Sequence, residues 1–212
     1  MAQEAPIHVV TGTDTGIGKT VFAAALADAL GASYWKPIQA GLDGETDAAA
    51  VARLGAIGPD RIVPGIYALR RAASPHLAAA DEGIDIRQRE LGLPPVKGPL
   101  VIEGAGGLMV PLSQRLLQID LFAYWGRPVI LVARTTLGTI NHCLLSMEAL
   151  RRRRVPVLGV AFVGDAEPDV ESTIVAMGRV RRLGRLPRLD PLTPTTLRQT
   201  FADNFDARDF LE

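Results

Sequence analysis

The chain has 212 residues, 48% of them hydrophobic, and its 23 basic residues equal its 23 acidic residues in number. No apolar run reaches the ~20 residues needed to span a bilayer, and the balanced charge argues against non-specific nucleic-acid binding, which depends on a basic field. The single cysteine, Cys143, excludes an internal disulfide and is typical of a reducing cytoplasm, and the three histidines do not cluster with other ligands as a zinc site requires.

We expect one domain over residues 1–210. No Ser-, Gly- or Pro-rich linker and no internal repeat divides this stretch, and its start lacks the basic-then-apolar pattern of a signal peptide. Leu211 and Glu212 resemble an expression-vector scar, so we leave them out of the prediction of the fold.

Short β-rich runs alternate with helical patterns along the chain. Strands are predicted over residues 7–10, 33–35, 100–102, 129–132, 157–162 and 182–184. Helices are predicted over residues 19–30, 46–54, 75–82, 119–125, 139–153 and 169–177. Several strands are nearly continuous runs of Val, Ile and Leu, which is typical of strands buried on both faces. The alternation predicts a mostly parallel α/β sheet with helices on both faces, in which ligands bind beyond the carboxyl ends of the strands.

The first predicted strand leads into a glycine-rich loop. The stretch Thr11-Gly12-Thr13-Asp14-Thr15-Gly16-Ile17-Gly18-Lys19-Thr20 is followed by an Ala- and Leu-rich helical run. Backbone N–H groups of such a loop and of the helix start favour an anion. Lys19 can reach the outer phosphates, and the Thr20 hydroxyl is a hard oxygen ligand suited to Mg²⁺. We therefore predict a nucleoside triphosphate site here.

The spacing of this loop is unusual. Five residues separate Gly12 from Gly18, where the ordinary phosphate-binding loop has four. Position 11 is Thr and position 14 is Asp, so the loop also lacks a second lysine at its start. This absence argues against the ATPases that position other molecules on membranes or chromosomes.

Three features follow the second predicted strand. Lys36 ends that strand, where it could stabilise a transferring phosphoryl group, although a surface lysine explains it as well. Asp47 begins a helix, and first-turn capping is the simpler interpretation, with a metal role as the alternative. Ser74-Pro75-His76 opens the next helix, and capping by Ser74 explains this motif better than a catalytic His76 does.

Acidic and glycine residues follow the third predicted strand. Glu103 directly follows the apolar run 99–102, so its carboxylate is expected at the same rim as Lys19 and Thr20. The turn 104–107 contains three glycines that allow a ligand to approach the backbone. A strand-ending acid beside a flexible turn is the alternative. Further along, the four arginines 151–154 close a predicted helix, and a solvated helix end explains them.

Together these motifs resemble the dethiobiotin synthetase family. The matching segments occur in the family's order between about residue 7 and residue 190: Thr11–Thr15 with Gly18–Thr20, Tyr34–Pro37, Asp47, Ser74–His76, Glu103–Gly107 with Val110–Leu112, and Leu137–His142. The resemblance implies a P-loop NTPase-like fold, and the extended loop spacing is the family's own.

The resemblance also implies an ATP- and Mg²⁺-dependent ring closure in biotin synthesis. In that family 7,8-diaminopelargonate takes up CO₂ as a carbamate on one amine. ATP then phosphorylates the carbamate to a carbamic–phosphoric anhydride. The second amine attacks this anhydride, which closes the ureido ring and releases phosphate. The protein mainly positions the reactants and neutralises charge in such phosphoryl transfers.

Family roles carry over to matching residues only. Lys19 and Lys36 are expected to neutralise the carbamate and the moving phosphoryl group, and Thr15 to orient phosphate. Thr20, Asp47 and Glu103 are expected to serve the metal. ATP is expected against Gly16, Ile17, Gly18, Lys19, Thr20, Asp47, Glu103, Gly104, Ala105, Gly106, Gly164, Asp165, Pro187, Arg188 and Leu189, the last three beside adenine. The substrate is expected against Lys36, Ala40, Gly138, Thr139, Ile140 and Asn141.

The family resemblance further implies a homodimer with the substrate at the subunit interface. The helix start at residues 138–141, contributed by the partner subunit, is expected to bind the remote carboxylate of the substrate. Two positions depart from the family pattern. Ala40 stands where the family usually has Ser or Thr, which removes one substrate hydrogen bond of about 1 kcal/mol. Gly164 stands where an Asn commonly reads the purine, which predicts weaker discrimination between ATP and other triphosphates.

Three other classes of protein stay open at this stage. A nucleotide-switched accessory protein needs a guanine-reading Lys-x-Asp motif and Cys or His ligands, whereas only Lys97 follows residue 36 among the lysines. A positioning ATPase needs the second lysine of the loop. An amide-forming synthetase or amidotransferase fragment normally carries a nucleophilic cysteine, whereas Cys143 lies inside a helical pattern, where buried packing explains it.

Overall fold

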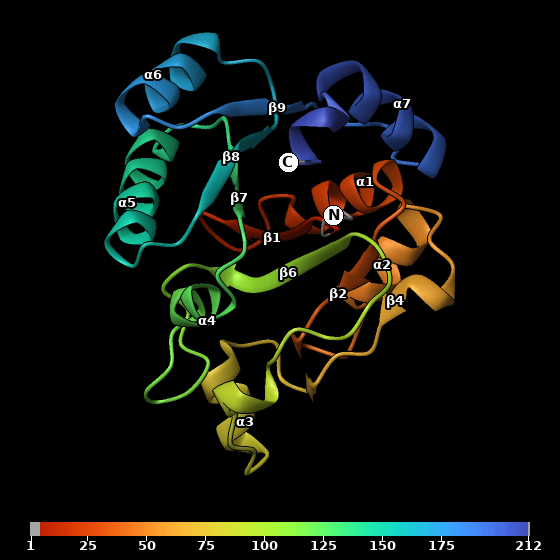
Figure 1. Cartoon of the computed structure of the whole chain (residues 1–212), viewed down its shortest axis with the longest axis vertical. Coiled ribbons are helices and arrows are strands. Elements are labelled where there is room, and N and C mark those ends of the chain that lie inside the picture. Colours follow the sequence, from red (N-terminus) through yellow and green to blue (C-terminus); the bar gives the residue numbers. More distant parts are fainter. Residues whose placement is uncertain (1–4, 212) are drawn as a thin grey trace.

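The computed structural model of the chain describes residues 5–211. Residues 1–4 of the expected domain and Glu212 of the expected scar lie outside the described residues. Seven strands form one sheet in the order β4-β2-β6-β1-β7-β8-β9, and every pairing between them is parallel. Their bounds are β1 Ile7–Gly12, β2 Ser33–Trp35, β4 Ile62–Val63, β6 Leu100–Gly107, β7 Val129–Arg134, β8 Val157–Val163 and β9 Arg182–Leu186. Figure 1 shows β1 and β6 side by side, both running toward the left of the view.

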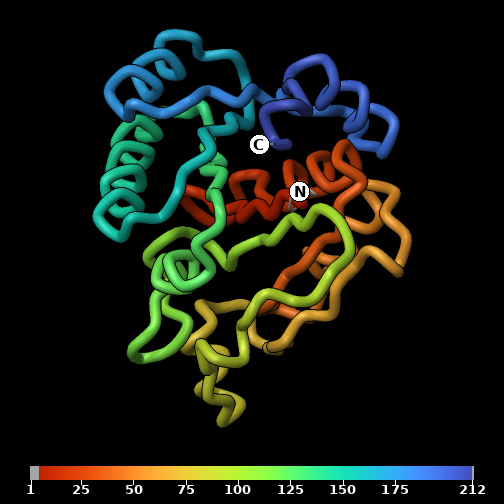
Figure 2. Tube along the Cα trace, viewed as in Figure 1, coloured from red at the N-terminus to blue at the C-terminus, as the bar shows by residue number. Residues whose placement is uncertain are grey.

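Helices cover both faces of the sheet, as the sequence predicted. Successive strand residues enter opposite cores, as the pleat requires: Val10 and Val101 pack in one core, and Val9 and Ile102 in another. The first face carries α1 Lys19–Ala29, α2 Asp47–Leu54 and α7 Pro194–Asn204. The other carries α3 Pro75–Asp81, α4 Gln118–Trp125, α5 Thr139–Arg152 and α6 Pro168–Gly178. Figure 2 shows the red β1 at the centre of the molecule, between the green segments of β6 and β7.

The six predicted strands and six predicted helices are all present, with ends shifted by a few residues. The sequence did not predict β4, α7, the two-stranded sheet of β3 Ile38–Ala40 and β5 Tyr67–Leu69, or the 3-10 helices η1 Pro59–Arg61, η2 Gln88–Glu90 and η3 Ala207–Phe210. The extra strands have two or three residues each, too few to show a hydrophobic period.

The predicted turn after Ile102 is wrong, because β6 continues as a strand to Gly107. Gly107 pairs with Gly12, and a Cβ added at Gly107 would lie 3.3 Å from the Gly12 carbonyl oxygen. The glycines therefore let β6 run directly beside the end of β1. This extension places the residues after Glu103 against the loop that follows β1.

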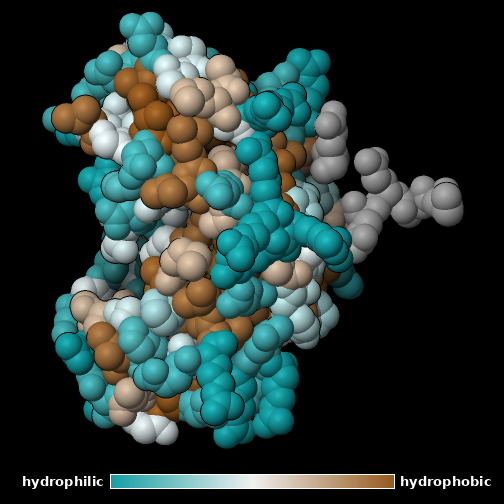
Figure 3. All heavy atoms as spheres, turned by 90° about the vertical axis from the view of Figure 1, so that its left-hand side faces the viewer, coloured by the Kyte–Doolittle hydropathy of each residue, from teal (hydrophilic) through white to brown (hydrophobic). Residues whose placement is uncertain are grey.

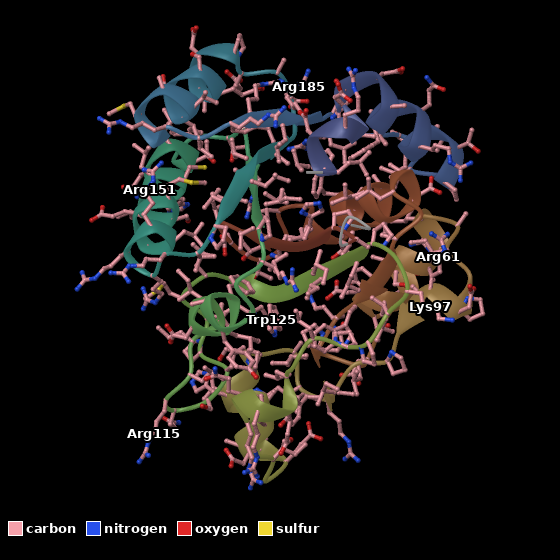
Figure 4. All side chains as sticks on the ribbon, in the orientation of Figure 1. Arg61, Lys97, Arg115, Trp125, Arg151 and Arg185 are labelled. Atoms are coloured by element: carbon pink, nitrogen blue, oxygen red, sulfur yellow. The ribbon has the colours of Figure 1, made fainter. Side chains whose placement is uncertain are left out.

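Two local interpretations also need correction. Ser74 stands at the start of α3, but its side chain makes no capping hydrogen bond, and its Oγ lies 3.0 Å from Nδ1 of His76. Two of the four arginines are not merely solvated. Arg151, labelled on α5 in Figure 4, donates to the carbonyls of Gly178 and Arg179, and Arg153 pairs with Asp120 of α4 at 2.8 Å.

Among residues 5–211, none of the helices combines the length and the apolar character that crossing a bilayer demands. Cys143 is buried, as predicted, with its Sγ 3.7 Å from the Thr139 hydroxyl. Burial raises the pKa of the Cys143 thiol, so this cysteine is suited to packing and not to nucleophilic attack.

Candidate active site

The loop of residues 13–18 joins the central strand β1 to α1. Gly18 caps α1 with φ +97°, in the left-handed region that favours glycine. A Cβ at Gly18 would lie 2.9 Å from Cγ1 of Val163, at the end of β8. The loop is therefore packed between β8 on one side and the glycines of β6 on the other. A Cβ at Gly106 would lie 3.3 Å from the Thr15 hydroxyl.

Lys19 is held inside this loop. Its side chain is buried, and its Nζ donates to the Asp14 carbonyl at 2.7 Å. Burial lowers the pKa of Lys19, even though the charge of Glu103 acts to raise it. Arg134, at the end of β7, donates to the Thr15 carbonyl at 3.3 Å and lies 3.4 Å from the Asp14 carboxylate. Arg134 was not predicted as a site residue, although its position at a strand end was an available signal, and Asp14 was predicted only as part of the loop.

Lys36 lies between two carboxylates. Its Nζ is 2.8 Å from Asp47 Oδ2 and 3.1 Å from Glu103 Oε1, and it donates to the Gly104 carbonyl at 3.0 Å. Burial alone would lower the pKa of Lys36, but the charges of Glu103 and Asp47 outweigh it, so the pKa lies above its usual value. Burial would likewise raise the pKa of Asp47, but Lys36 and Thr20 hold it below its usual value. The surface-lysine interpretation of Lys36 is therefore wrong.

The Thr20 hydroxyl lies between the same two carboxylates. Its Oγ1 is 2.8 Å from Asp47 Oδ1 and 3.0 Å from Glu103 Oε1, and its single proton goes to one of them. The second oxygen of Glu103, Oε2, accepts a hydrogen bond of 2.9 Å from Tyr34. Burial, followed by the charge of Glu103, raises the pKa of Tyr34 well above its usual value, which keeps its hydroxyl a donor.

The oxygens of Thr20, Asp47 and Glu103 fit a magnesium ion bound with a nucleotide. Mg²⁺ takes hard oxygen ligands and is usually held by one or two carboxylates together with phosphates and water. The Thr20 hydroxyl lies within hydrogen-bonding distance of the carboxylates of Asp47 and Glu103, so these three residues supply such a ligand set. Across residues 5–211, no group of three or more His, Cys, Asp or Glu side chains is placed to hold a metal ion.

Asp47 lies in the first turn of α2, as predicted, but its side chain does not cap the helix. Thr46 is the N-cap of α2, and its hydroxyl accepts from the Ala49 N–H at 3.3 Å. The Asp47 carboxylate is thus free to contact Lys36 and Thr20. Its backbone N–H donates to the Gln39 side chain at 3.2 Å, and this support from Gln39 was not predicted.

A cavity of about 430 Å³ opens beside these charges. Predicted residues that line it are Thr15, Lys36, Ala40, Asp47, Ala105 and Gly106. Gln39 and Ser74 also line it, and neither was predicted as a site residue. Gln118 was not predicted either. Its side chain is buried, and its Oε1 accepts a hydrogen bond from the Ala105 N–H at 3.0 Å, which fixes the end of β6.

Two predicted groups lie elsewhere. Residues 138–141 form the start of α5, with Asn141 exposed, and they do not line this cavity. Gly164 and Asp165 follow β8, and Pro187, Arg188 and Leu189 follow β9. The end of β8 borders the loop through Val163, so this second group lies on the side of the loop opposite β6.

The fold is shared with a protein of known structure. The MinC:MinD cell division protein complex of Aquifex aeolicus matches with a TM-score of 0.54 at 14% identity, covering 92% of this chain and 86% of that chain. A family model described as an AAA domain matches residues 8–196. The predicted fold class, a P-loop NTPase-like α/β sheet with helices on both faces, is confirmed.

Curated relatives carry one common name. A protein of Rhodopseudomonas palustris strain TIE-1, named ATP-dependent dethiobiotin synthetase BioD, is 62% identical over 203 residues, which cover 96% of each chain. A protein of Brucella ovis with the same name is 59% identical over 202 residues, covering 95% of each. At this identity over nearly the whole length, the chain belongs to the ATP-dependent dethiobiotin synthetase family.

Proposed function

We propose that this protein closes the ureido ring of dethiobiotin from 7,8-diaminopelargonate, CO₂ and ATP, as one synthetase domain in the cytoplasm. Family membership makes it an ATP-dependent ligase of biotin synthesis. The main structural support for this mechanism is the position of the Lys36 ammonium. It lies between Asp47 and Glu103, one strand away from the phosphate loop, and lines a cavity together with Thr15.

The reaction proceeds in three steps that need charge control and little covalent help from the protein. One amine of the diamine adds to CO₂ and loses a proton, giving a carbamate. A carbamate oxygen attacks the γ-phosphorus of ATP, the bond to ADP breaks, and the carbamic–phosphoric anhydride forms. The second amine attacks the carbonyl carbon, the bond to phosphate breaks, and the nitrogen loses a proton as the ring closes.

Lys36 and Lys19 supply the positive charge for these steps. Lys36 remains an ammonium because the carboxylates beside it raise its pKa, and its position in the cavity wall suits the carbamate and the transferring phosphoryl group. Lys19 serves the outer phosphates from within the loop. Thr15, in the wall of the same cavity, orients the phosphoryl group that moves.

Thr20, Asp47 and Glu103 are the residues to hold Mg²⁺. When bound, the ion neutralises negative charge on the phosphates of ATP. The Gln39 side chain accepts a hydrogen bond from the Asp47 backbone N–H, and this bond keeps the start of α2 beside Thr20. Gly164, Asp165 and residues 187–189 form the side of the site that faces the nucleoside.

The proposal includes a homodimer. Residues 138–141 do not reach the cavity of their own chain, so a second copy is needed to bring them to the substrate carboxylate. Figure 3 looks onto the side toward which β1 and β6 run, and brown apolar side chains gather along it. Met109, Leu137 and Leu145 are large apolar residues of the loops and the helix at this edge, and each is more than half exposed. This apolar surface is the proposed interface.

The decisive experiment measures ADP release from the purified protein with MgATP and bicarbonate, with and without 7,8-diaminopelargonate. We expect release only with the diamine, together with a product heavier than the diamine by one carbonyl in place of two hydrogens. ADP release that ignores the diamine would contradict the proposal and favour a nucleotide-switched protein.

A further inference from the structure

We propose that Tyr34 sets the metal preference of the site, by holding Glu103 so that only one carboxylate oxygen faces the metal and Mg²⁺ is selected over Ca²⁺. This inference rests on the proposed function, because it takes Glu103 as a metal-serving residue. Tyr34 does not touch the cavity, so its role is to position Glu103.

The two oxygens of Glu103 have separate surroundings. Oε1 faces the Thr20 hydroxyl at 3.0 Å and the Lys36 ammonium at 3.1 Å. Oε2 accepts a hydrogen bond from Tyr34 at 2.9 Å, its one such bond among residues 5–211. A hydrogen bond from a hydroxyl to an ionised carboxylate is charge-assisted, so it is stronger than a hydrogen bond between neutral groups. Rotation of the carboxylate would break this bond, so Oε1 stays toward Thr20.

Strand register makes the contact and burial fixes it. Tyr34 pairs with Val101 on β6, and Glu103 is two residues further along the same face. A long aromatic side chain reaches this diagonal neighbour. Tyr34 is fully buried in the core between the sheet and the helices α1 and α2. The structure gives its hydroxyl no other partner among the described residues, so holding Glu103 is what this hydroxyl does there.

Coordination chemistry links this contact to metal choice. Mg²⁺ demands near-ideal octahedral geometry at short range, to which a carboxylate contributes one oxygen, whereas Ca²⁺ takes six to eight ligands and accepts both oxygens of one carboxylate. With Oε2 bound to Tyr34, Glu103 offers a single oxygen. Without the hydroxyl, Oε2 is released and a two-oxygen arrangement suited to Ca²⁺ becomes available.

Calorimetry of ATP binding in the absence of the diamine tests the inference. The dissociation constant of ATP is measured with Mg²⁺ and with Ca²⁺ for the wild-type protein, Tyr34→Phe and Tyr67→Phe. Tyr67 is the matched control, because it is buried and its hydroxyl donates to Glu90 at 2.6 Å, away from the cavity. Both substitutions delete one hydroxyl that bonds to a carboxylate, and melting temperatures without metal measure the structural cost of each.

The wild-type protein and Tyr67→Phe are expected to share one preference for MgATP over CaATP. Tyr34→Phe is expected to reduce that ratio by about tenfold or more, as the loss of a partner behind a metal ligand commonly does. A Tyr34→Phe protein with the wild-type ratio, or a Tyr67→Phe protein with the same reduction, would overturn the inference. Equal affinity of the wild-type protein for the two complexes would also overturn it, whether or not Tyr34→Phe folds.

The same data separate this inference from the proposed function. If ATP binds the wild-type protein equally well with and without any divalent ion, the metal site of the proposed function fails, and the role of Tyr34 fails with it. If binding depends on Mg²⁺ but the Tyr34→Phe ratio is unchanged, only the role of Tyr34 fails.

Discussion

Lys36 takes its properties from residues that are distant in the sequence. Its ammonium contacts Asp47, eleven positions away, and Glu103, 67 positions away. Buried ion pairs of this kind contribute little net stability when intact, but removal of one partner leaves an uncompensated charge that costs several kcal/mol. We therefore expect Lys36 to affect stability as well as the proposed reaction.

Lys36→Gln is expected to lower kcat by at least about 10²-fold, because the charge that stabilises the moving phosphoryl group is lost. It is also expected to lower the free energy of unfolding by about 3 kcal/mol, because Asp47 and Glu103 then lack a cation. Steady-state kinetics and urea denaturation measure the two effects. Lys97→Gln is the control, since Lys97 is exposed just ahead of β6, at the opposite end of the strands from the phosphate loop (Figure 4). Wild-type turnover by a folded Lys36→Gln protein would remove Lys36 from the mechanism.

Gly164, which we propose to lie beside the nucleoside, has a constrained backbone. It has φ +130°, and a Cβ there would lie 2.7 Å from the Thr135 hydroxyl, so no side chain fits this conformation. Its N–H donates to the Leu186 carbonyl at 3.0 Å, and its carbonyl accepts from Arg185 at 3.0 Å. The N–H is therefore already used, and the carbonyl has one of its two lone pairs engaged.

We therefore expect the protein to discriminate weakly between nucleoside triphosphates with different bases. A site that hydrogen-bonds its substrate rejects an analogue by about 10⁴-fold or more, and without such bonds we expect kcat/KM for ATP and GTP to agree within about tenfold. Initial rates with the diamine and each triphosphate give the ratio. A preference for ATP of several orders of magnitude would show that another residue reads the base.

At the scale of elements, His8 joins β1 to the C-terminal 3-10 helix η3. Its Nε2 lies 2.7 Å from the Phe210 carbonyl, which only an N–H can satisfy, so Nε2 carries the proton. Nδ1 is buried and has no partner among residues 5–211. Burial lowers the pKa of His8, although the Phe210 carbonyl acts to raise it. The neutral ring is thus the form that the fold accommodates.

Stability is therefore expected to depend on pH through His8. With a folded pKa below the ordinary value of 6.5, the unfolded chain binds more protons in this range. The free energy of unfolding then stays level above that value and falls as the pH drops below it, by up to about 1.4 kcal/mol per pH unit. Denaturant titrations across this range measure the slope. The variant His8→Gln keeps an N–H donor but does not titrate, so its stability is expected to lack this pH dependence. An unchanged slope in that variant would show that another group causes the pH dependence.

At the scale of the whole molecule, the apolar surface beside the phosphate loop is not covered by any of residues 5–211. Leu137 is fully exposed, and Leu145 lines a cavity of about 380 Å³ together with Thr13 and Asp14. Exposed apolar side chains of this number at one edge are typical of an interaction site. The proposed dimer buries them and brings residues 138–141 toward the cavity.

Leu145→Glu is expected to convert the dimer to a monomer, because it places a charge in the apolar centre of the interface. The rate of ring closure is expected to fall when the dimer dissociates, chiefly through a higher KM for the diamine. Analytical ultracentrifugation and kinetics measure the two effects. Met177→Glu is the control, since Met177 is equally apolar and exposed but lies on α6. A monomeric wild-type protein with full activity would contradict the proposed dimer.

The sequence by itself determined the features that depend on near neighbours. The pattern of apolar residues located six strands and six helices. Apolar residues recur about every 3.6 positions on the buried side of a helix, and every second position or continuously in a strand buried on one or both faces. The loop 11–20 was recognisable because its glycines, Lys19 and Thr20 act within one strand–helix turn. Strands of two or three residues, such as β4, carry too short a pattern, and they were missed.

Only the tertiary structure decided which side chains meet. Lys36, Asp47 and Glu103 come from three separate segments. Local rules favoured a helix cap for Asp47 and left a surface lysine and a strand-ending acid as alternatives for the other two. Their contact follows from the strand order, which places β2 beside β6 and β6 beside β1. The hydroxyl of Tyr34 on Glu103 depends on the same register. Such pairings come from packing between distant segments, and a single sequence records the residues but not the distances between them.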